Sequence, residues 1–408
     1  MKSMKSIALA TLAAAMVAAV SPSIAQQQDI PIAVIVPLSG PWARGGENIK
    51  NGALLAVEDI NKAGGIKALN GAKLRLVVAD AGDSPDKARN AAQRVLSDEP
   101  NLAGGTGSWL SAFTLAVTEV TERAGVPWMT GSFGDPITSR GFKYVFQVPV
   151  IASEIAKKIV PVISTLAESS TGSKPKSVAI ITDNTPSPTA LLKPLREGGF
   201  KAAGMSIATD QIFTPPLSDA TSLVQAVRAA RPEWLFLPAT STQDNALIIQ
   251  KLNEFGLGKG RLPTVANSGQ VVLPEMRNLV SADLMEGVLN VLGFWPNKEA
   301  QDVVERFKAK FNEPWMISDA IEGYADIQLF KEAIERAGSA DKEKVAQALR
   351  TIDITDGPAK FFPGGRVRFD EKGRRVDAEI VVVQWQKGQP VLVYPLDVAV
   401  AKPIWPKQ

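Results

Sequence analysis

The stretch IAVIVPLSGPWARGGENIKNGALLAVEDINKAGGI, residues 32–66, contains the pattern that decides the fold. It opens with an apolar, β-branched run at 32–38, which is typical of a buried strand. After a Gly-rich turn, apolar residues recur at steps of three and four over about 46–63, and this spacing puts them on one face of a helix. These residues are Ile49, Ala53, Val57 and Ile60. The stretch therefore predicts a strand followed by an amphipathic helix.

The same alternation continues along the chain. Expected strands lie at 74–79, 102–105 and 126–129, with helices at 86–97 and 110–124. A second alternation begins after Val148, with helices at 153–167, 189–198, 217–230 and 245–255 and strands at 178–182, 202–207, 234–238 and 264–266. Because helical crossovers join parallel strands, the repetition predicts parallel sheets covered on both faces. The second alternation restarts the architecture, so we expect two α/β lobes.

The pattern changes beyond Glu286. A strand at 287–292 is followed by three charged helices, near 299–311, 319–337 and 342–351, and by a β-rich tail at 367–369, 380–385 and 391–394. Neither domain length nor loop statistics decide which lobe each of these segments joins. From the residues alone, that question stays open.

The first 25 residues have the pattern of a secretory signal peptide. Lys2 and Lys5 precede a mostly apolar run at 7–20, and Ser23-Ile24-Ala25 provides a small-x-small cleavage site. The apolar run is too short to span a bilayer, so a membrane anchor is the weaker alternative. We expect cleavage after residue 25 and a soluble mature chain, long enough for two hydrophobic cores.

The residue types that are missing exclude several classes of function. The chain has no Cys and no His, which removes disulfides, thiol and imidazole catalysts, and the usual nitrogen and sulfur ligands of zinc and copper. Its formal net charge of +3 provides no field for nucleic acid or anionic lipid. Hydrolase-elbow, phosphate-loop and dinucleotide motifs are also missing. We expect no enzyme, no cofactor, no metal and no nucleic-acid partner, although a Ser-Lys pair or a carboxylate dyad stays formally possible.

A series of short motifs follows in order along the chain. They are VIVPLSGP at 34–41, GG at 45–46, GA at 52–53, INKAGGI at 60–66, Asp80 with DSP at 83–85, GS at 107–108, GVP at 125–127 and PIT at 136–138. Each alone is explained by a turn or a helix end. Together, and at similar spacing, they resemble the leucine/isoleucine/valine-type periplasmic binding proteins. That family is the branch of type I solute-binding proteins that serves branched-chain amino acid ABC transporters.

The resemblance implies an α/β fold of two Rossmann-like lobes joined by a three-strand hinge, with the ligand in the cleft between the lobes. Lobe I would comprise 29–148 plus 292–378, and lobe II 149–291 plus 379–408. It also implies a monomer in the periplasm that closes on a small carboxylate-bearing solute, such as a branched-chain or other amino acid, and docks on the membrane permease of an ABC importer. A ligand sensor for a receptor would use the same fold and stays an alternative.

The first candidate contacts in lobe I lie where the expected strand at 102–105 gives way to a helix, because ligands of open parallel sheets bind beyond the carboxyl ends of the strands. The residues are Gly107, Ser108 and Trp109. Ser108 is expected to cap the helix. The resemblance implies that its hydroxyl also donates to the ligand carboxylate.

The next junction in lobe I supplies Gly131, Ser132 and Phe133. Gly131 allows close backbone approach and Ser132 offers a hydroxyl. The resemblance implies that this segment completes the ligand contacts. Phe133 stands where the family often has a small polar residue, and it either stacks on the ligand or packs in the core.

Lobe II departs from the family pattern at three positions. Ser187 and Thr240 stand where the family has tyrosines, and Ser268 stands near the family's acidic residue that neutralises an amino acid's ammonium group. Without that carboxylate, a buried ammonium would lack a charge partner, which is costly. The resemblance therefore leaves a standard amino acid ligand in doubt.

Other residues offer alternatives. The nearby acids Asp183, Asp244 and Glu275 either substitute for the missing carboxylate or serve as caps and solvated groups. Trp42 and Arg44, in the Gly-rich loop after the first strand, either cover a ring and grip a carboxylate or belong to a surface loop. With Phe133, they make an aromatic carboxylate or an amide a competing ligand.

Overall fold

The computed structural model describes residues 29–406, so the expected signal peptide lies outside the described residues. The first sheet has five parallel strands in the order β2-β1-β3-β4-β5. Their bounds are β1 Ile30–Val36, β2 Leu74–Asp80, β3 Gly104–Gly107, β4 Trp128–Thr130 and β5 Val145–Gln147. Every residue of β1 is buried, as expected of a strand covered by helices on both faces.

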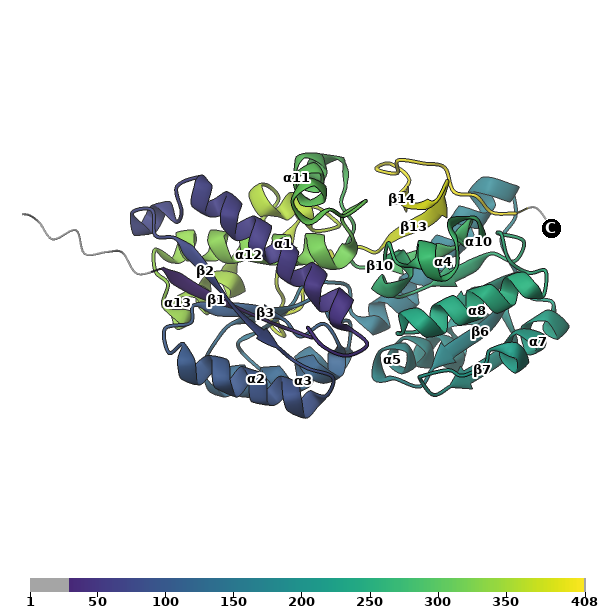
Figure 1. Cartoon of the computed structure of the whole chain (residues 1–408), viewed down its shortest axis with the longest axis horizontal. Helices are drawn as coiled ribbons and strands as arrows, with labels where there is room; N and C mark the ends of the chain where they lie inside the picture. The colour runs from purple at the N-terminus through teal and green to yellow at the C-terminus, as the bar shows by residue number, and fades with distance from the viewer. Residues whose placement is uncertain (1–28, 407–408) are drawn as a thin grey trace, which may run out of the picture.

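Helices from two distant parts of the chain cover this sheet, as Figure 1 shows. The early helices are α1 Ala43–Lys62, α2 Pro85–Asp98 and α3 Ser111–Arg123, and the late ones are α11 Gln301–Phe311, α12 Ser318–Ala337 and α13 Lys342–Thr351. Helix α12 lies against α1, and a Cβ added at Gly323 would come within 2.2 Å of the Ile49 carbonyl oxygen. The close approach that this glycine permits brings α12 directly against α1.

The second sheet has seven strands in the order β14-β13-β10-β9-β8-β6-β7. Their bounds are β6 Ser177–Asp183, β7 Ser206–Phe213, β8 Trp234–Leu237, β9 Thr264–Ala266, β10 Leu289–Leu292, β13 Val381–Gln386 and β14 Gln389–Tyr394. The strands from β6 to β10 run parallel, whereas β13 and β14 join the edge antiparallel. The expected α/β class with two mostly parallel sheets is confirmed.

The helices of the second lobe come from the middle of the chain. They are α4 Ala152–Thr171, α5 Pro186–Pro194, α6 Phe200–Ala202, α7 Thr221–Ala230, α8 Thr242–Glu254, α9 Met276–Leu279 and α10 Ala282–Met285. Short 3-10 or π turns lie at η1 Lys67–Leu69, η2 Asp135–Thr138, η3 Leu195–Gly199, η4 Gly269–Val272, η5 Lys298–Ala300 and η6 Gly357–Phe361, and strands β11 Asp353–Ile354 and β12 Val367–Arg368 form a small ribbon. None of the described helices is long and apolar enough to cross a membrane.

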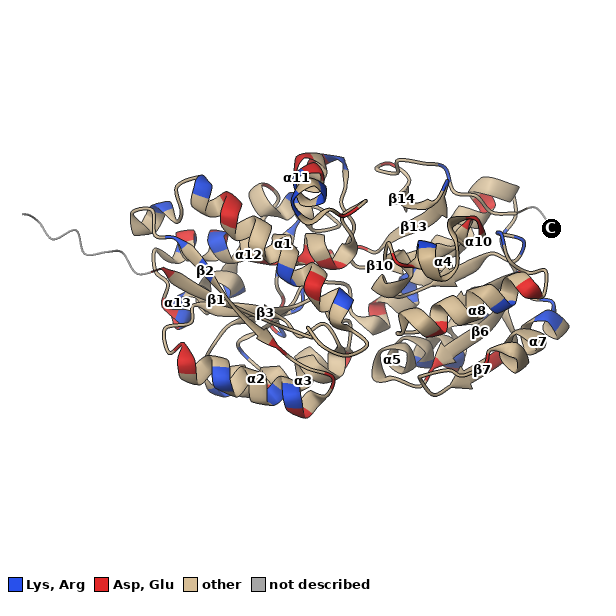
Figure 2. Ribbon diagram, viewed as in Figure 1, with Lys and Arg blue, Asp and Glu red and all other residues tan. Residues whose placement is uncertain are grey.

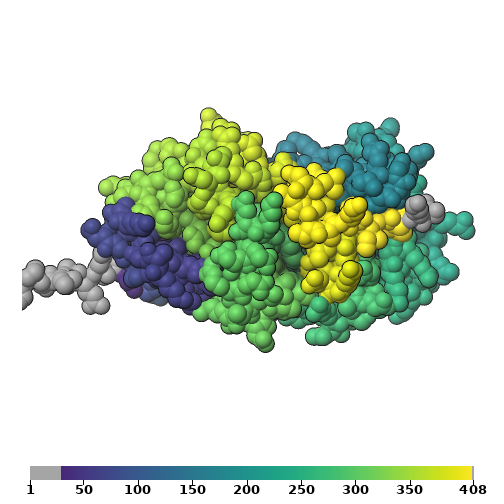
Figure 3. Space-filling view, turned by 90° about the horizontal axis from the view of Figure 1, so that it is seen from above, coloured from purple at the N-terminus to yellow at the C-terminus, as the bar shows by residue number. Residues whose placement is uncertain are grey.

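The chain passes between the two lobes after β5, after β10 and before β13. The C-terminal segment therefore returns to the second lobe, where Figure 3 shows it in yellow beside the yellow-green part of the first lobe. This arrangement answers the topological question that the sequence left open. The residue limits of the two lobes stay a prediction.

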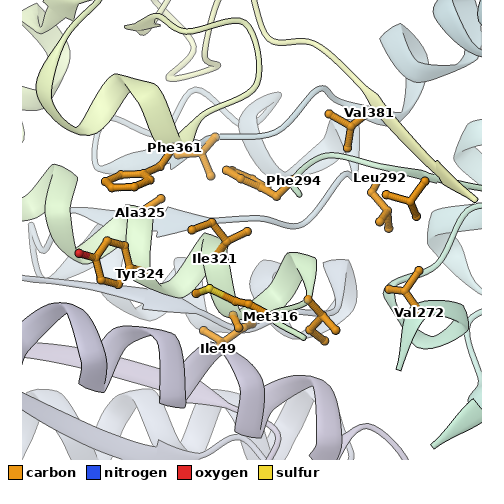
Figure 4. Packing of buried hydrophobic residues seen from close by; sticks show 14 of the residues in the cluster. Ile49, Val272, Leu292, Phe294, Met316, Ile321, Tyr324, Ala325, Phe361 and Val381 are labelled. Carbon is orange, nitrogen blue, oxygen red and sulfur yellow. The ribbon is translucent and has the colours of Figure 1, made fainter. Parts of the chain in front are cut away.

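One apolar cluster continues through the crossings from lobe to lobe. Figure 4 shows Ile49 of α1 and Ile321 of α12 on one side, Phe294 in the crossing, and Val272 and Val381 on the other side. Phe294 is 2% exposed and packs edge-on against Phe362 at 5.7 Å between ring centroids. The lobes are thus joined by packed side chains as well as by the backbone.

The largest error among the predicted strands lies at one edge of the second sheet. The strand expected at 202–207 is β7, which runs from Ser206 to Phe213. It lies at the edge of its sheet, its residues are mostly exposed, and polar side chains such as Asp210 interrupt the apolar pattern.

Lys, Arg, Asp and Glu are interspersed over both lobes in the view of Figure 2.

Candidate functional site

A pocket lies where the carboxyl ends of the strands of both lobes face each other. Its empty volume is about 680 Å³, part of which is open to solvent. The residues that line it are Trp109, Leu110, Ser111, Gly131, Ser132, Phe133, Ser187, Thr240, Asn267, Ser268, Gly269, Leu292, Gly293, Phe294, Ser318, Asp319 and Glu322. Both lobes and the crossing after β10 therefore contribute to one pocket, as expected for a site between α/β sheets.

The wall from the first lobe includes the junction that follows β4. The Ser132 hydroxyl donates to the Trp109 carbonyl oxygen at 2.7 Å and lies 2.7 Å from the Thr114 hydroxyl. A Cβ added at Gly131 would lie only 1.9 Å from Oε1 of Glu322, so the glycine leaves room for that carboxyl group. Phe133 lines the pocket and also packs against the core of the second lobe, and stacking of its ring on a ligand stays a prediction.

Ser108 does not cap a helix, so this part of the prediction was wrong. Helix α3 begins at Ser111 with Leu110 at the N-cap position, and no side chain caps it. Ser108 and Trp109 instead adopt left-handed backbone conformations, with φ of 70° and 52°, which are strained for residues with side chains. This double turn delays the helix and brings Trp109 to the pocket.

Gly107 and Ser108 lie behind the pocket wall rather than on it. Both are buried, and Ser108 is 0% exposed. The Ser108 hydroxyl oxygen has no hydrogen-bond partner among the described residues. Contact between Ser108 and a ligand remains a prediction.

The second lobe contributes Ser187, Thr240 and Ser268 to the pocket, together with Asn267. The Ser268 backbone N–H donates to Oδ1 of Asn290 at 3.0 Å, and its hydroxyl oxygen accepts from the Gln270 N–H at 3.2 Å. The three departures from the family pattern therefore line the same pocket. They supply hydroxyl groups, Asn267 supplies an amide, and none of the four side chains is a carboxylate.

The three acids proposed as substitutes do not line the pocket. Asp183 accepts hydrogen bonds from the backbone N–H groups of Thr185 at 2.9 Å and Thr240 at 2.6 Å. Asp244 accepts from the Leu217 N–H at 2.9 Å, and Glu275 binds Arg44. The cap alternative describes Asp183 and Asp244, whose carboxylates organise loops of the second lobe.

Trp42 and Arg44 also lie outside the pocket lining. Trp42 packs edge-on against Phe113, at 5.8 Å between ring centroids. The Arg44 guanidinium forms two ion pairs of 2.6 Å, with Glu275 of the second lobe and with Glu313 of the first. Arg44 thus bridges the lobes through protein carboxylates rather than facing the pocket.

Sequence reasoning missed a row of acids on helix α12. Asp319, Glu322 and Asp326 follow one another at steps of three and four residues, so they share one face of the helix. Asp319 and Glu322 line the pocket and are 6% and 7% exposed. Asp326 is fully buried one turn further on and accepts a hydrogen bond of 2.5 Å from the Thr106 hydroxyl.

Burial controls the protonation of these acids. It raises the pKa of Asp319 to about 7, against the opposing effects of the Trp109 indole and the Ser318 hydroxyl. Burial also raises the pKa of Asp326 to about 7, with the Thr106 hydroxyl acting in the opposite direction. Burial, followed by repulsion from Asp326 and Asp319, raises the pKa of Glu322 well above its usual range. Near neutral pH, the pocket therefore favours carboxyl groups that hold protons.

The sequence contains a signal for this row, because the three acids alternate with apolar residues that are buried in the same helix. Ala320, Ile321 and Ala325 are each at most 1% exposed. A helix whose other residues are mostly apolar is expected to be buried. Acids that recur on one face of such a helix therefore indicate a polar face that lines an internal site. Within the part of the chain that the structure describes, no group of His, Cys, Asp and Glu side chains is placed to hold a metal ion.

Comparison with known families points to the same fold and class of protein. The model of a family described as "Periplasmic binding protein" matches residues 29–390. The Leu/Ile/Val-binding protein homolog 7 of Brucella suis is 30% identical over 405 residues, covering 97% of this chain and 98% of that protein.

Solved structures with the same fold include proteins with different ligands. A branched-chain amino acid transporter substrate-binding protein of Streptococcus pneumoniae, in complex with isoleucine, superposes with a TM-score of 0.76 at 21% identity, covering 90% of this chain and all of that one. A solute-binding protein of an ABC transporter from R. palustris, in complex with benzoate, superposes with a TM-score of 0.73 at 16% identity, covering 93% and 98% of the two chains.

Proposed function

Because the chain belongs to the periplasmic binding protein family, which comprises solute-binding proteins rather than enzymes, we propose that it is the substrate-binding subunit of an ABC importer. Its ligand is a small carboxylate-bearing solute, a branched-chain or other amino acid. Relatives with this class of ligand in their names cover nearly the whole chain. Binding brings the two lobes together and involves no chemical step.

The observation that carries this proposal is a pocket at the carboxyl ends of the strands that is lined from both lobes. Ser132 and Glu322 come from the first lobe, Thr240 and Ser268 from the second, and Phe294 from a crossing between them. A solute that touches both walls is bound more tightly when the lobes are closed than when they are apart. Its binding energy therefore favours closure, and closure removes the solute from water.

Within the pocket, we assign the ligand carboxylate to the N-terminal end of α3. The first turn of this helix leaves backbone N–H groups free, which favours an anion. Ser111 and Ser132 lie beside it, and Gly131, Phe133 and Trp109 form the adjoining wall. Ser187, Thr240 and Ser268 approach the solute from the second lobe. Ser108 joins these contacts only if its unpaired hydroxyl turns towards the carboxylate.

The proposal also places the protein in the periplasm, after removal of a signal peptide, where one copy delivers its solute to a membrane permease. Lys, Arg, Asp and Glu residues are interspersed along the ribbons of both lobes (Figure 2), and those at the surface provide charged groups for docking on loops of a permease. The permease recognises the lobes in their closed arrangement.

A second candidate ligand is an aromatic carboxylate or an amide. The rings of Trp109, Phe133 and Phe294 line the pocket and provide surface for stacking. The R. palustris protein bound to benzoate shows that this fold accommodates such a solute.

The experiment that tests the proposal is thermal unfolding of the ligand-stripped mature protein with branched-chain amino acids, polar amino acids, amides and aromatic carboxylates. A solute at about 100 times its dissociation constant should stabilise the fold by about 2.7 kcal/mol. Stabilisation by an amino acid supports the main proposal, and stabilisation by benzoate alone supports the second ligand class. Failure of every solute in the panel contradicts both.

A further inference from the structure

The charged side chains that line the pocket all have the same sign. Among the described residues these are Asp319 and Glu322, and the lining contains no Lys or Arg. Arg44, which the sequence suggested for a ligand carboxylate, is engaged by Glu275 and Glu313 instead. The charge of the pocket therefore favours a solute that brings a positive group to one end of it.

One carboxyl oxygen of Asp319 is unpaired, and this points to a ligand. Asp319 is 94% buried, and its Oδ1 atom accepts a hydrogen bond of 3.5 Å from the Ser318 hydroxyl. Its Oδ2 atom has no hydrogen-bond partner among the described residues, although the Trp109 indole lies next to the carboxyl group. A buried carboxylate without a partner is costly, and structures normally provide one. The described residues supply no cation at this carboxyl group, so its unpaired oxygen is open to a positive group of the solute.

The position of Asp319 suits a contact made on closure. A Cβ added at Gly269 of the second lobe would lie 3.1 Å from Oδ1 of Asp319, and one added at Gly45 of α1 would lie 3.3 Å from Oδ2. The carboxyl group thus sits where the lobes meet. A positive group held there is enclosed from both sides.

We propose that Asp319 and Glu322 together form the subsite for an ammonium group of the solute. This inference rests on the proposed function and specifies its ligand. The two carboxyl groups lie one turn apart on α12 of the first lobe. They supply the negative charge for an ammonium group that Ser268 of the second lobe lacks.

Proton exchange accompanies this binding. Burial raises the pKa of Asp319, so the empty subsite holds protons near neutral pH. An ammonium group stabilises the charged carboxylates and expels a proton as it enters. The empty protein thereby avoids a buried negative charge, and the loaded protein contains a neutralised pair.

Three solutes that share the branched side chain of leucine distinguish the contribution of the carboxylate from that of the ammonium group. The probes are L-leucine, 3-methylbutylamine, which lacks the carboxylate, and 4-methylpentanoate, which lacks the ammonium group. Each is titrated calorimetrically into the ligand-stripped full mature protein, in two buffers with different ionisation enthalpies. We expect heat from leucine, weaker binding of the amine, no binding of 4-methylpentanoate, and release of a proton in the first two cases.

Isosteric variants then locate the subsite. Asp319→Asn and Glu322→Gln keep the shape of the side chains, and each should weaken leucine about 10- to 100-fold and reduce proton release. Asp302→Asn is the matched control, since Asp302 is a 71% exposed carboxylate on α11. It should leave affinity and proton release unchanged. Circular dichroism of each variant reports whether it is folded.

The outcomes distinguish the inference from the function on which it rests. Tight binding of 4-methylpentanoate, or leucine affinity unchanged in folded Asp319→Asn and Glu322→Gln, overturns the ammonium subsite and leaves a solute-binding protein for carboxylates. Binding of none of the three probes counts against an amino acid ligand and against the subsite with it. Binding of leucine with variant-dependent proton release supports both.

Discussion

The indole N–H of Trp315, in the first lobe between α11 and α12, donates a hydrogen bond of 2.9 Å to the carbonyl oxygen of Val272 in the second lobe. The same ring packs edge-on against Trp385 of β13, at 5.7 Å between centroids, and the Arg277 guanidinium lies 4.8 Å from its centre. Trp315 is 8% exposed. One side chain of the first lobe is thus inserted into the second, directly before the helix that carries the pocket acids.

Replacement of Trp315 by Phe should weaken ligand binding without unfolding the lobes. The variant keeps a ring beside Trp385 but loses the hydrogen bond to Val272, which is worth about 0.5–1.5 kcal/mol. Since that bond exists only when the lobes touch, its loss favours their separation. We expect affinity to fall about 2- to 10-fold in calorimetry, and small-angle scattering of the ligand-free variant to show a larger radius of gyration.

Replacement of Arg44 by Gln should have a smaller effect. Its guanidinium is 28% exposed and Glu275 is 43% exposed, so solvent weakens their attraction, and exposed ion pairs contribute about 0–1 kcal/mol. Affinity should fall by no more than about fivefold, and added salt should reduce the difference from the wild type. A loss as large as that of the pocket-acid variants would contradict the position of Arg44 outside the site.

The stability of the ligand-free protein should decrease as pH rises from about 4 to about 7. Asp319 has a pKa of about 7 in the folded protein against 3.8 when unfolded, so the folded state binds more protons in that window. Unfolding free energy therefore declines with pH there. Glu322 and Asp326 act in the same direction. Thermal melts at about pH 5 and about pH 8 measure the change.

Asp319→Asn provides the control for this pH effect. The amide carries no titrating proton, so its melting temperature should depend less on pH and should exceed that of the wild type at about pH 8, by a few °C. The groups around Asp319 are Glu322 on its own helix, the Trp109 indole, Ser318, and the backbone at Gly45 and Gly269. If the variant showed the same pH dependence as the wild type, a group other than Asp319 would be responsible for it.

Gly131→Ala should displace Glu322. The added Cβ would lie 1.9 Å from Oε1 of Glu322, so the carboxyl group must move, at a cost of about 1–3 kcal/mol. Glu322→Ala removes the obstacle, and the double variant should be more stable than the sum of the single changes by about 0.5–3 kcal/mol. If the losses of unfolding free energy in the two single variants add up to the loss in the double variant, the two residues do not interact.

The sequence predicted the layers of the fold because buried strands and amphipathic helices have distinct periods. Strand β1 and helix α1 illustrate both, with continuous burial in one and a buried face in the other. Seven of the eleven candidate site residues line the pocket, because they follow strands whose carboxyl ends meet at one edge: Trp109, Gly131, Ser132, Phe133, Ser187, Thr240 and Ser268.

The remaining features depended on contacts that no local pattern encodes. The sequence suggested that Arg44 could bind a ligand carboxylate. In the folded protein, its guanidinium instead donates hydrogen bonds to Glu275 and Glu313, which lie far along the chain. The sequence placed Asp319 on a charged helix but gave no sign of a pocket there. Its carboxyl group lines the pocket because that helix, late in the chain, packs beside the first sheet. Ser108 failed as a cap because two left-handed residues delay the helix.

The late position of α12 has a consequence for how the chain acquires its structure. The first sheet is complete at Gln147, yet the helix that packs on α1 beside it spans residues 318–337, and the edge strands of the second sheet end at Tyr394. A nascent chain that stops before these segments leaves apolar surface of both sheets in water. Both lobes therefore complete the burial of their apolar surface only when the last quarter of the chain has been synthesised.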